Sequence, residues 1–236
     1  RFSPVGNLPF SMLLLGFPIL TILGERVELT RFVAPTISSQ ARHGIWILAI
    51  AFALILIQTL FPTIAPQPIM IIWILLLMAV AIPLAWAERR LMTRGKKPLH
   101  RYLGTHLMVA YGWLLLGLII LLAIAIRGQT VALMDAATHS LAVGFIGSMI
   151  LAHAPIIMPA ILGRPLIEER LNRLPLWLLT IGNLLRVVSG IAGETGLGRA
   201  MATGLAGALT LLAVITFVIF MLRSIQFSAS SQSSRS

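Results

Sequence analysis

The chain has 236 residues, 58% of them apolar and 11% charged, and its 18 basic residues outnumber its 7 acidic ones to give a formal charge of +11. Several apolar runs are as long as the ~20 residues that cross a bilayer, so the composition predicts an all-α, polytopic membrane helix bundle. Apolar and polar residues do not alternate with period two, which excludes an outer-membrane barrel. The lack of cysteine excludes disulfides, iron–sulfur clusters and covalent c-type haem.

Seven transmembrane spans are expected, and they form a single helical domain over residues 1–227. The spans cover residues 8–24, 44–62, 69–87, 104–126, 135–160, 174–193 and 199–223. Residues 228–236, SASSQSSRS, offer no large apolar side chain to bury. We therefore expect a disordered, serine-rich tail there.

The distribution of basic residues predicts the orientation of the spans. The loops after spans one, three and five, together with the tail, hold fourteen Lys and Arg residues, whereas the opposite side holds three. Because Lys and Arg are enriched on the cytoplasmic side, we expect a cytoplasmic C terminus and a multi-pass protein of the bacterial cytoplasmic (inner) membrane. The membrane orientation thus accounts for the net positive charge of the chain, and a nucleic-acid partner is not expected. The expected partners are the lipid bilayer and other membrane or redox subunits.

The fifth expected span has a histidine near each end, His139 and His153. In a regular α-helix the two lie within about 40° of one face and about 21 Å apart along the axis. An ionisable residue inside a membrane indicates a functional site by default, because its burial in lipid is costly. One histidine in each leaflet resembles the arrangement by which di-haem b-type cytochromes hold their haems. Alternatively, each imidazole bonds a neighbouring carbonyl or hydroxyl and does no chemistry.

His106, just inside the fourth span, supplies a second imidazole on the cytoplasmic side. Spans four and five form a hairpin in which residues whose numbers sum to about 261 share a level, so His106 and His153 lie within about 3 Å of one depth. Two imidazoles at one depth on facing helices are what bis-histidine haem ligation requires. For His139 the second ligand stays open: a methionine, another subunit, or none. A three-histidine copper site cannot be assembled there, so copper is not expected.

Arg186 is the only basic residue deep inside a predicted span, nearer the level of His139 than that of His153. Its burial requires a partner: a haem propionate, a quinone oxygen or a buried carboxylate. Asn183, one turn earlier, could share that site. Alternatively, Arg186 extends to the membrane surface and pairs with Glu194 or a lipid phosphate.

Residues 135–223 resemble the NnrS-type family of bacterial haem-associated membrane proteins. The resemblance is carried by His139, Gly144, Gly147 and Met149, LGRP at 162–165, LLRVV at 184–188 and the last span, rich in small residues; GERVELTRF at 24–32 is also similar. It implies haem, copper as a further metal, a link to nitric oxide metabolism in denitrifying bacteria, and functional positions at His139 and Arg186. The chain departs from the family in its shorter length, and residues 160–163 lack the Gly-His pair expected before LGRP.

Together these features predict a subunit that binds haem b and passes electrons between the quinone pool and a partner redox protein, in nitric oxide or respiratory metabolism. His106, His153 and His139 are the candidate ligands of haem iron, and Arg186 and Asn183 are further cofactor contacts; quinone is a second candidate ligand. No hydrolase or phosphate-binding motif is present, so we expect an electron-transfer or accessory subunit rather than a self-contained enzyme. The alternatives are a cofactor-free anchor or assembly subunit of a larger complex, and a pigment-binding photosynthetic subunit.

Overall fold

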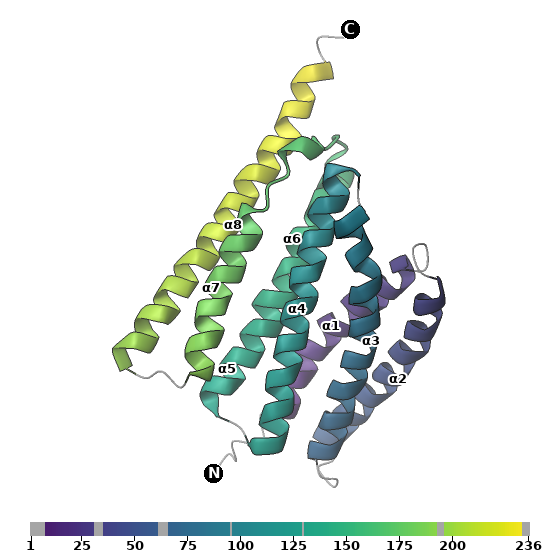
Figure 1. Cartoon of the computed structure of the whole chain (residues 1–236), viewed down its shortest axis with the longest axis vertical. Helices are drawn as coiled ribbons and strands as arrows, with labels where there is room; N and C mark the ends of the chain where they lie inside the picture. Colours follow the sequence, from purple (N-terminus) through teal and green to yellow (C-terminus); the bar gives the residue numbers. More distant parts are fainter. Residues whose placement is uncertain are drawn as a thin grey trace.

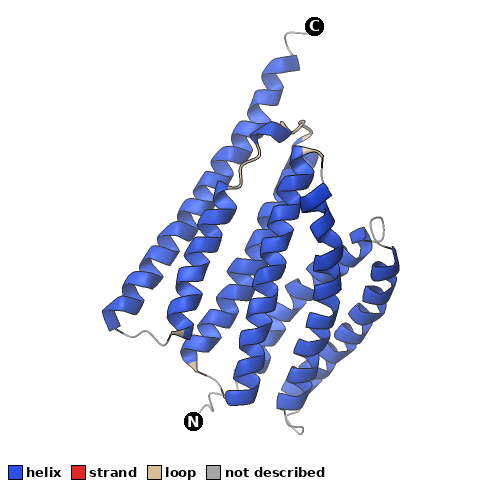
Figure 2. Cartoon of the chain, in the orientation of Figure 1, coloured by secondary structure: helices blue, strands red, loops and turns tan. Residues whose placement is uncertain are grey.

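The computed structural model describes residues 8–30, 35–60, 66–94, 96–128, 130–192 and 196–232, and this part of the chain is all-helical, as predicted (Figure 2). In chain order the helices are α1 (Leu8–Thr30), α2 (Pro35–Leu60), α3 (Pro66–Arg94), α4 (Pro98–Arg127), α5 (Val131–His139), η2 (Ser140–Gly147), α6 (Ser148–Leu162), η3 (Glu168–Arg170), α7 (Leu174–Ile191) and α8 (Gly196–Gln232). Each of the seven predicted spans overlaps one continuous helical segment.

The long helices run alternately up and down, so the two termini lie at opposite ends of the bundle (Figure 1). Helices that follow one another in the chain pack side by side, and α4 lies in the middle, against α3 on one side and α5, η2 and α6 on the other. The helix α8 packs chiefly against α7. Most of the buried core lies where α1 to α4 meet α5, η2 and α6.

Local sequence explains several helix ends. Pro35, Pro66 and Pro98 each occupy the first position of a helix, where the missing N–H has no intrahelical partner to lose. The hydroxyl of Thr130 accepts a hydrogen bond from the Leu133 N–H and caps α5. The helix α6 ends at Gly163, whose φ of 61° is the left-handed conformation that favours glycine.

Among the described residues, five helices are long and apolar enough to cross a membrane: Pro68–Arg89, Pro98–Arg127, Val131–Leu162, Glu168–Ile191 and Gly196–Ile225. The outermost of these, Gly196–Ile225, has only 17% of its apolar window buried in the protein. Its outward side chains, such as Leu197, Leu205 and Leu211, are exposed. Such a helix is stable where lipid rather than water covers its outer face.

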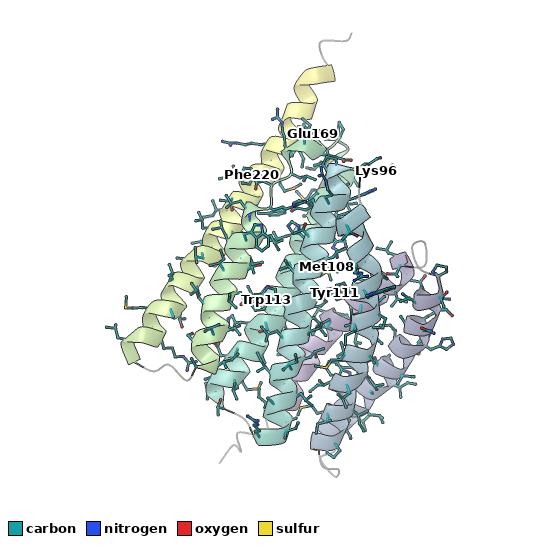
Figure 3. All side chains as sticks on the ribbon, in the orientation of Figure 1. Lys96, Met108, Tyr111, Trp113, Glu169 and Phe220 are labelled. Atoms are coloured by element: carbon teal, nitrogen blue, oxygen red, sulfur yellow. The ribbon has the colours of Figure 1, made fainter. Side chains whose placement is uncertain are left out.

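The fifth span is interrupted in its middle by a π-helix, η2, of eight residues. The wider i→i+5 turn of a π-helix is rare and occurs frequently at functional sites. Here it accompanies close packing on α4, because Gly144 lies against the Trp113 ring, labelled in Figure 3. The segment was expected to be a regular α-helix, so the side-chain directions after His139 differ from those predicted.

The helix α8 is longer than the predicted last span. It continues to Gln232 and so includes residues 228–232, the first part of the segment expected to be disordered. Extending an existing helix fixes one residue for each hydrogen bond gained, which is far easier than starting a new helix. Residues 233–236 of the predicted tail lie outside the described residues.

Candidate functional site: a cavity between α5, η2, α7 and α8

Arg186 of α7 is paired with Asp135 of α5 through two hydrogen bonds. Arg186 Nε lies 3.1 Å from Asp135 Oδ2, and its NH2 atom lies 3.0 Å from Oδ1. The side chains are 28% and 24% exposed, so the pair is partly shielded from solvent. A two-point guanidinium–carboxylate pair is strong and directional. Of the partners considered for Arg186, a carboxylate is the one present; Glu194 lies outside the described residues.

The same aspartate orients His139. His139 Nδ1 lies 2.9 Å from the backbone oxygen of Asp135 and 3.3 Å from its carboxylate Oδ1. Both oxygens are acceptors, so in the neutral imidazole we assign the proton to Nδ1. The lone pair of Nε2 is then available to a ligand. A histidine that donates one ring N–H to a backbone carbonyl has its ring orientation and tautomer fixed.

His139, Asn183 and Arg186 line one cavity of about 380 Å³. Val143 of η2, Gly182 of α7 and five residues of α8 complete the wall: Ala206, Gly207, Thr210, Leu211 and Val214. A Cβ at Gly182 would come within 2.9 Å of the Ala206 backbone oxygen. Glycine at this position therefore permits the close contact between α7 and α8 beside the cavity. The cavity is thus largely apolar, and His139, Asn183, Arg186 and Thr210 are the polar residues in its lining.

Asn183 is the most unusual polar residue of this cavity. It is 2% exposed, and neither Oδ1 nor Nδ2 has a hydrogen-bond partner in the part of the chain that the structure describes. An unsatisfied buried polar group costs about 1–3 kcal/mol. Such groups are rare in folded proteins and call for a specific explanation. A ligand with both an acceptor and a donor would satisfy the two atoms of this amide.

A second group of polar residues, here called the α1–α3 cluster, consists of the buried Arg26, Thr30, Glu88 and Tyr111 and the partly buried His153. Glu88 Oε1 accepts bonds from Arg26 Nε at 2.9 Å, Arg26 NH2 at 2.8 Å and Thr30 Oγ1 at 3.1 Å. Arg26 and Glu88 are only 7% and 3% exposed. The Tyr111 hydroxyl lies beside the pair but in no well-formed hydrogen bond, and Glu88 Oε2 has no partner among the described residues.

His153 belongs to this cluster through Arg26. Its Nε2 lies 2.9 Å from Arg26 NH1, and its Nδ1 lies 2.7 Å from the Met149 backbone oxygen. A guanidinium can only donate, so Nε2 accepts and Nδ1 donates. The Nε2 lone pair that a haem iron would need is therefore already used by Arg26 in this arrangement.

His106 is fully buried and has different surroundings. Its Nδ1 lies 2.8 Å from the Tyr102 backbone oxygen, its ring centroid lies 3.9 Å from that of Tyr102, and its Nε2 has no partner among the described residues. The Tyr102 hydroxyl donates to the Leu151 backbone oxygen at 3.0 Å. That contact places His106 and His153 within about two helical turns of one depth. Their imidazoles nevertheless bond different groups, and the structure does not bring the two rings together.

Of the five predicted site residues, the structure brings together His139, Asn183 and Arg186, and leaves His106 and His153 elsewhere. His153 lines a cavity between α1 and α6, whereas His139 lines the one beside α7 and α8. The two histidines thus line different cavities, and the π-helix between them changes the rotation per residue on which their predicted common face was based. No group of three or more potential metal-binding side chains occurs in the described residues.

Sequence reasoning missed Asp135 as the partner of Arg186, and its span limits, 8–24 and 69–87, left Arg26 and Glu88 just outside the predicted spans. One signal was available: Asp135 and His139 are four residues apart, which places them on neighbouring turns of one helix face. A second was the scarcity of acidic residues, seven in the whole chain, because each one next to a long apolar run, Glu88 and Asp135 among them, is a candidate partner for a buried basic residue.

Comparison with known proteins gives a family and no function. A family model described as a domain of unknown function, DUF8744, matches residues 6–226. No curated protein and no solved structure matches the chain. The resemblance to the NnrS-type family thus stays a prediction.

Proposed function

We propose that this chain, which belongs to the DUF8744 family, is an electron-transfer subunit that binds a quinone-type ligand in the cavity between α5, η2, α7 and α8. Such a ligand has an aromatic ring with carbonyl or hydroxyl oxygens and an apolar tail. The apolar wall of α8 suits the ring and tail. The polar groups on the opposite wall suit the oxygens.

The observation that carries the proposal is that Asn183, whose amide has no partner among the described residues, lines the same cavity as His139, whose Nδ1 is engaged by Asp135 and leaves Nε2 for a ligand. Asn183 Nδ2 can donate to a quinone carbonyl, and Oδ1 can accept from a quinol hydroxyl. His139 Nε2 can accept a second hydroxyl proton. A cavity of about 380 Å³ lies within the range of small-molecule sites, which combine apolar walls with a few placed polar groups.

Haem b is the second candidate ligand, and one specific observation favours it. His139 lines the cavity and its Nδ1–H donates to a backbone carbonyl, which leaves Nε2 for a ligand, as in most metal-ligating histidines. His139 would hold the iron, and bound haem would supply one-electron transfer. Arg186 is engaged by Asp135 and is not free to neutralise a propionate. A reduced-minus-oxidised absorption spectrum of the purified protein separates the candidates, because haem b alone gives an α-band.

Replacing Asn183 with leucine tests the quinone site. Loss of one or two buried hydrogen bonds should weaken binding of a short-chain quinone at least about tenfold. The measurement is isothermal titration calorimetry on protein in lipid nanodiscs. The matched control is Thr180→Val. Thr180 lies one turn earlier on α7, its hydroxyl also has no partner among the described residues, and it does not line the cavity. Equal affinities of wild type and Asn183→Leu contradict the proposal.

We further propose that all seven long helices span a bacterial inner membrane with the C terminus in the cytoplasm. In support, Lys96 and the segment around Glu169 lie at the same end of the bundle as the C terminus (Figure 3). Basic side chains are expected at the cytoplasmic end. The loop that contains Lys97 should therefore lie in the cytoplasm. A reporter enzyme that is active only in the cytoplasm should be active when it is fused after Lys97. Activity of a reporter that works only outside the inner membrane overturns this topology.

A further inference from the structure

We infer that His139 takes a proton from a hydroxyl of the bound ligand at Nε2 and that Asp135 stabilises the resulting imidazolium. This inference deepens the proposed function and rests on it. It assigns the reduced, hydroxyl-bearing form, the quinol, as the form whose proton the site accepts. It also assigns Asp135 and Arg186, which were not expected to act together, a joint role in placing the proton acceptor.

The geometry is that of an imidazole backed by a fixed carboxylate. His139 Nδ1 lies 3.3 Å from Asp135 Oδ1, and Arg186 holds both carboxylate oxygens of Asp135 at 3.0 and 3.1 Å. An imidazole oriented in this way by a carboxylate is a general base whose opposite nitrogen faces the reacting group. Here that nitrogen is Nε2, and His139 lines the cavity. Arg186 acts as a positioning residue because it fixes Asp135 rather than touching the ligand oxygen.

The proton transfer balances without an oxidant. The O–H bond of the quinol breaks, its electron pair stays on the ligand oxygen, and an Nε2–H bond forms on His139. The products are a quinol anion and an imidazolium. Asn183 Nδ2–H, which has no protein partner in the described residues, is available to donate to the oxygen that becomes negative. A hydrogen-bond donor that is already in place beside the oxygen stabilises its developing negative charge and so favours deprotonation of the quinol.

The charged groups around His139 come from three helices. Asp135 lies one turn earlier on its own helix, Arg186 faces it from α7, and Arg199 of α8 interacts with Asp135. The positive charges of the two arginines destabilise an imidazolium at His139. The negative charge of Asp135, whose Oδ1 lies 3.3 Å from His139 Nδ1, stabilises it. Arg186 is already neutralised by Asp135 through two hydrogen bonds, so its opposition is reduced.

The position of Asp135 relates the site to one end of the bundle. Asp135 lies near the start of α5, at the end of the bundle where the N terminus lies (Figure 1), and its side chain is 24% exposed. The carboxylate that stabilises the imidazolium therefore lies between His139 and this end of the bundle. That end is opposite to the one that holds Lys96 and Glu169.

The experiment compares three short-chain quinols that share one tail and differ only in the acidity of the ring hydroxyl, tuned by electron-withdrawing substituents. Their dissociation constants are measured anaerobically on the full chain in lipid nanodiscs, for wild type and His139→Gln. Proton transfer predicts that wild-type affinity rises about threefold for each tenfold gain in acidity, in a Brønsted-type dependence. A glutamine can accept a hydrogen bond but not a proton, so in His139→Gln the affinity should depend on acidity much less steeply than in wild type.

The matching quinones serve as the control, because they carry no proton to transfer. They should bind wild type and His139→Gln with similar affinity, which shows that the cavity is intact. Asp135→Asn should reduce the dependence on acidity, and Asp135→Glu should restore part of it. The inference is overturned if wild-type affinity is independent of acidity, or if His139→Gln keeps the wild-type dependence. If neither quinones nor quinols bind wild type, the proposed function itself fails.

Discussion

Replacing Glu88 with alanine lowers the free energy of unfolding by about 3–5 kcal/mol, the largest loss we expect from removing one side chain. The change leaves the Arg26 guanidinium without its carboxylate at a position that is 7% exposed. It also removes the acceptor of Thr30 Oγ1. An uncompensated charge in the protein interior is costly because neither water nor a counter-ion solvates it. Equilibrium unfolding in mixed micelles of rising denaturing-detergent content measures the effect.

A double substitution separates the value of the pair from the cost of breaking it. Arg26→Met together with Glu88→Met removes both charges, and should be far less damaging than either single change. The exposed pair of Arg42 and Glu28 is the matched control, with side chains 51% and 56% exposed and a 3.8 Å separation. Its loss should change stability by at most about 1 kcal/mol. Equal effects of Glu88→Ala and Glu28→Ala contradict a stabilising role for the α1–α3 cluster.

The presence and order of the helices followed from sequence because apolar length alone distinguishes a spanning helix from other elements. The rotation of each helix about its axis did not follow. Helices that are apolar all round give little information on which face is buried. Arg26 and Glu88 illustrate this limit: both lie near the ends of apolar runs, where a surface position and a buried pair are equally consistent with the pattern.

The candidate site was predicted in part because depth depends only on the rise along a helix. That reasoning placed Arg186 and Asn183 near the level of His139, and the structure puts all three on one cavity. The direction of His153 depends on rotation, which the π-helix between His139 and His153 alters. No rule of spacing or composition predicts a π-helix there. It accompanies a tertiary contact, the packing of Gly144 on Trp113 of α4.

That contact leads to the second large effect. Gly144→Ala should lower the free energy of unfolding by about 1–3 kcal/mol, because the core has no room for the added methyl group. A Cβ at this position would come within 2.5 Å of Trp113 Cγ and 2.8 Å of Trp113 Cβ. Trp113 is itself 5% exposed and cannot move aside freely. The same detergent titration measures the change.

Gly112→Ala is the matched control, one residue before Trp113 on α4. A Cβ there meets no atom within 4 Å, so the alanine should stabilise the helix by about 0.5–1 kcal/mol. Opposite signs for the two glycines show that contact with Trp113, rather than helix propensity, determines the cost at Gly144.

Because Gly144 lies in η2, directly after the turn that holds His139, a strained η2 should also shift the imidazole relative to Asn183. Gly144→Ala should therefore weaken quinone binding, whereas Gly112→Ala should leave it unchanged. Unaltered stability and binding in Gly144→Ala would mean that η2 yields to the methyl group and does not fix the position of His139.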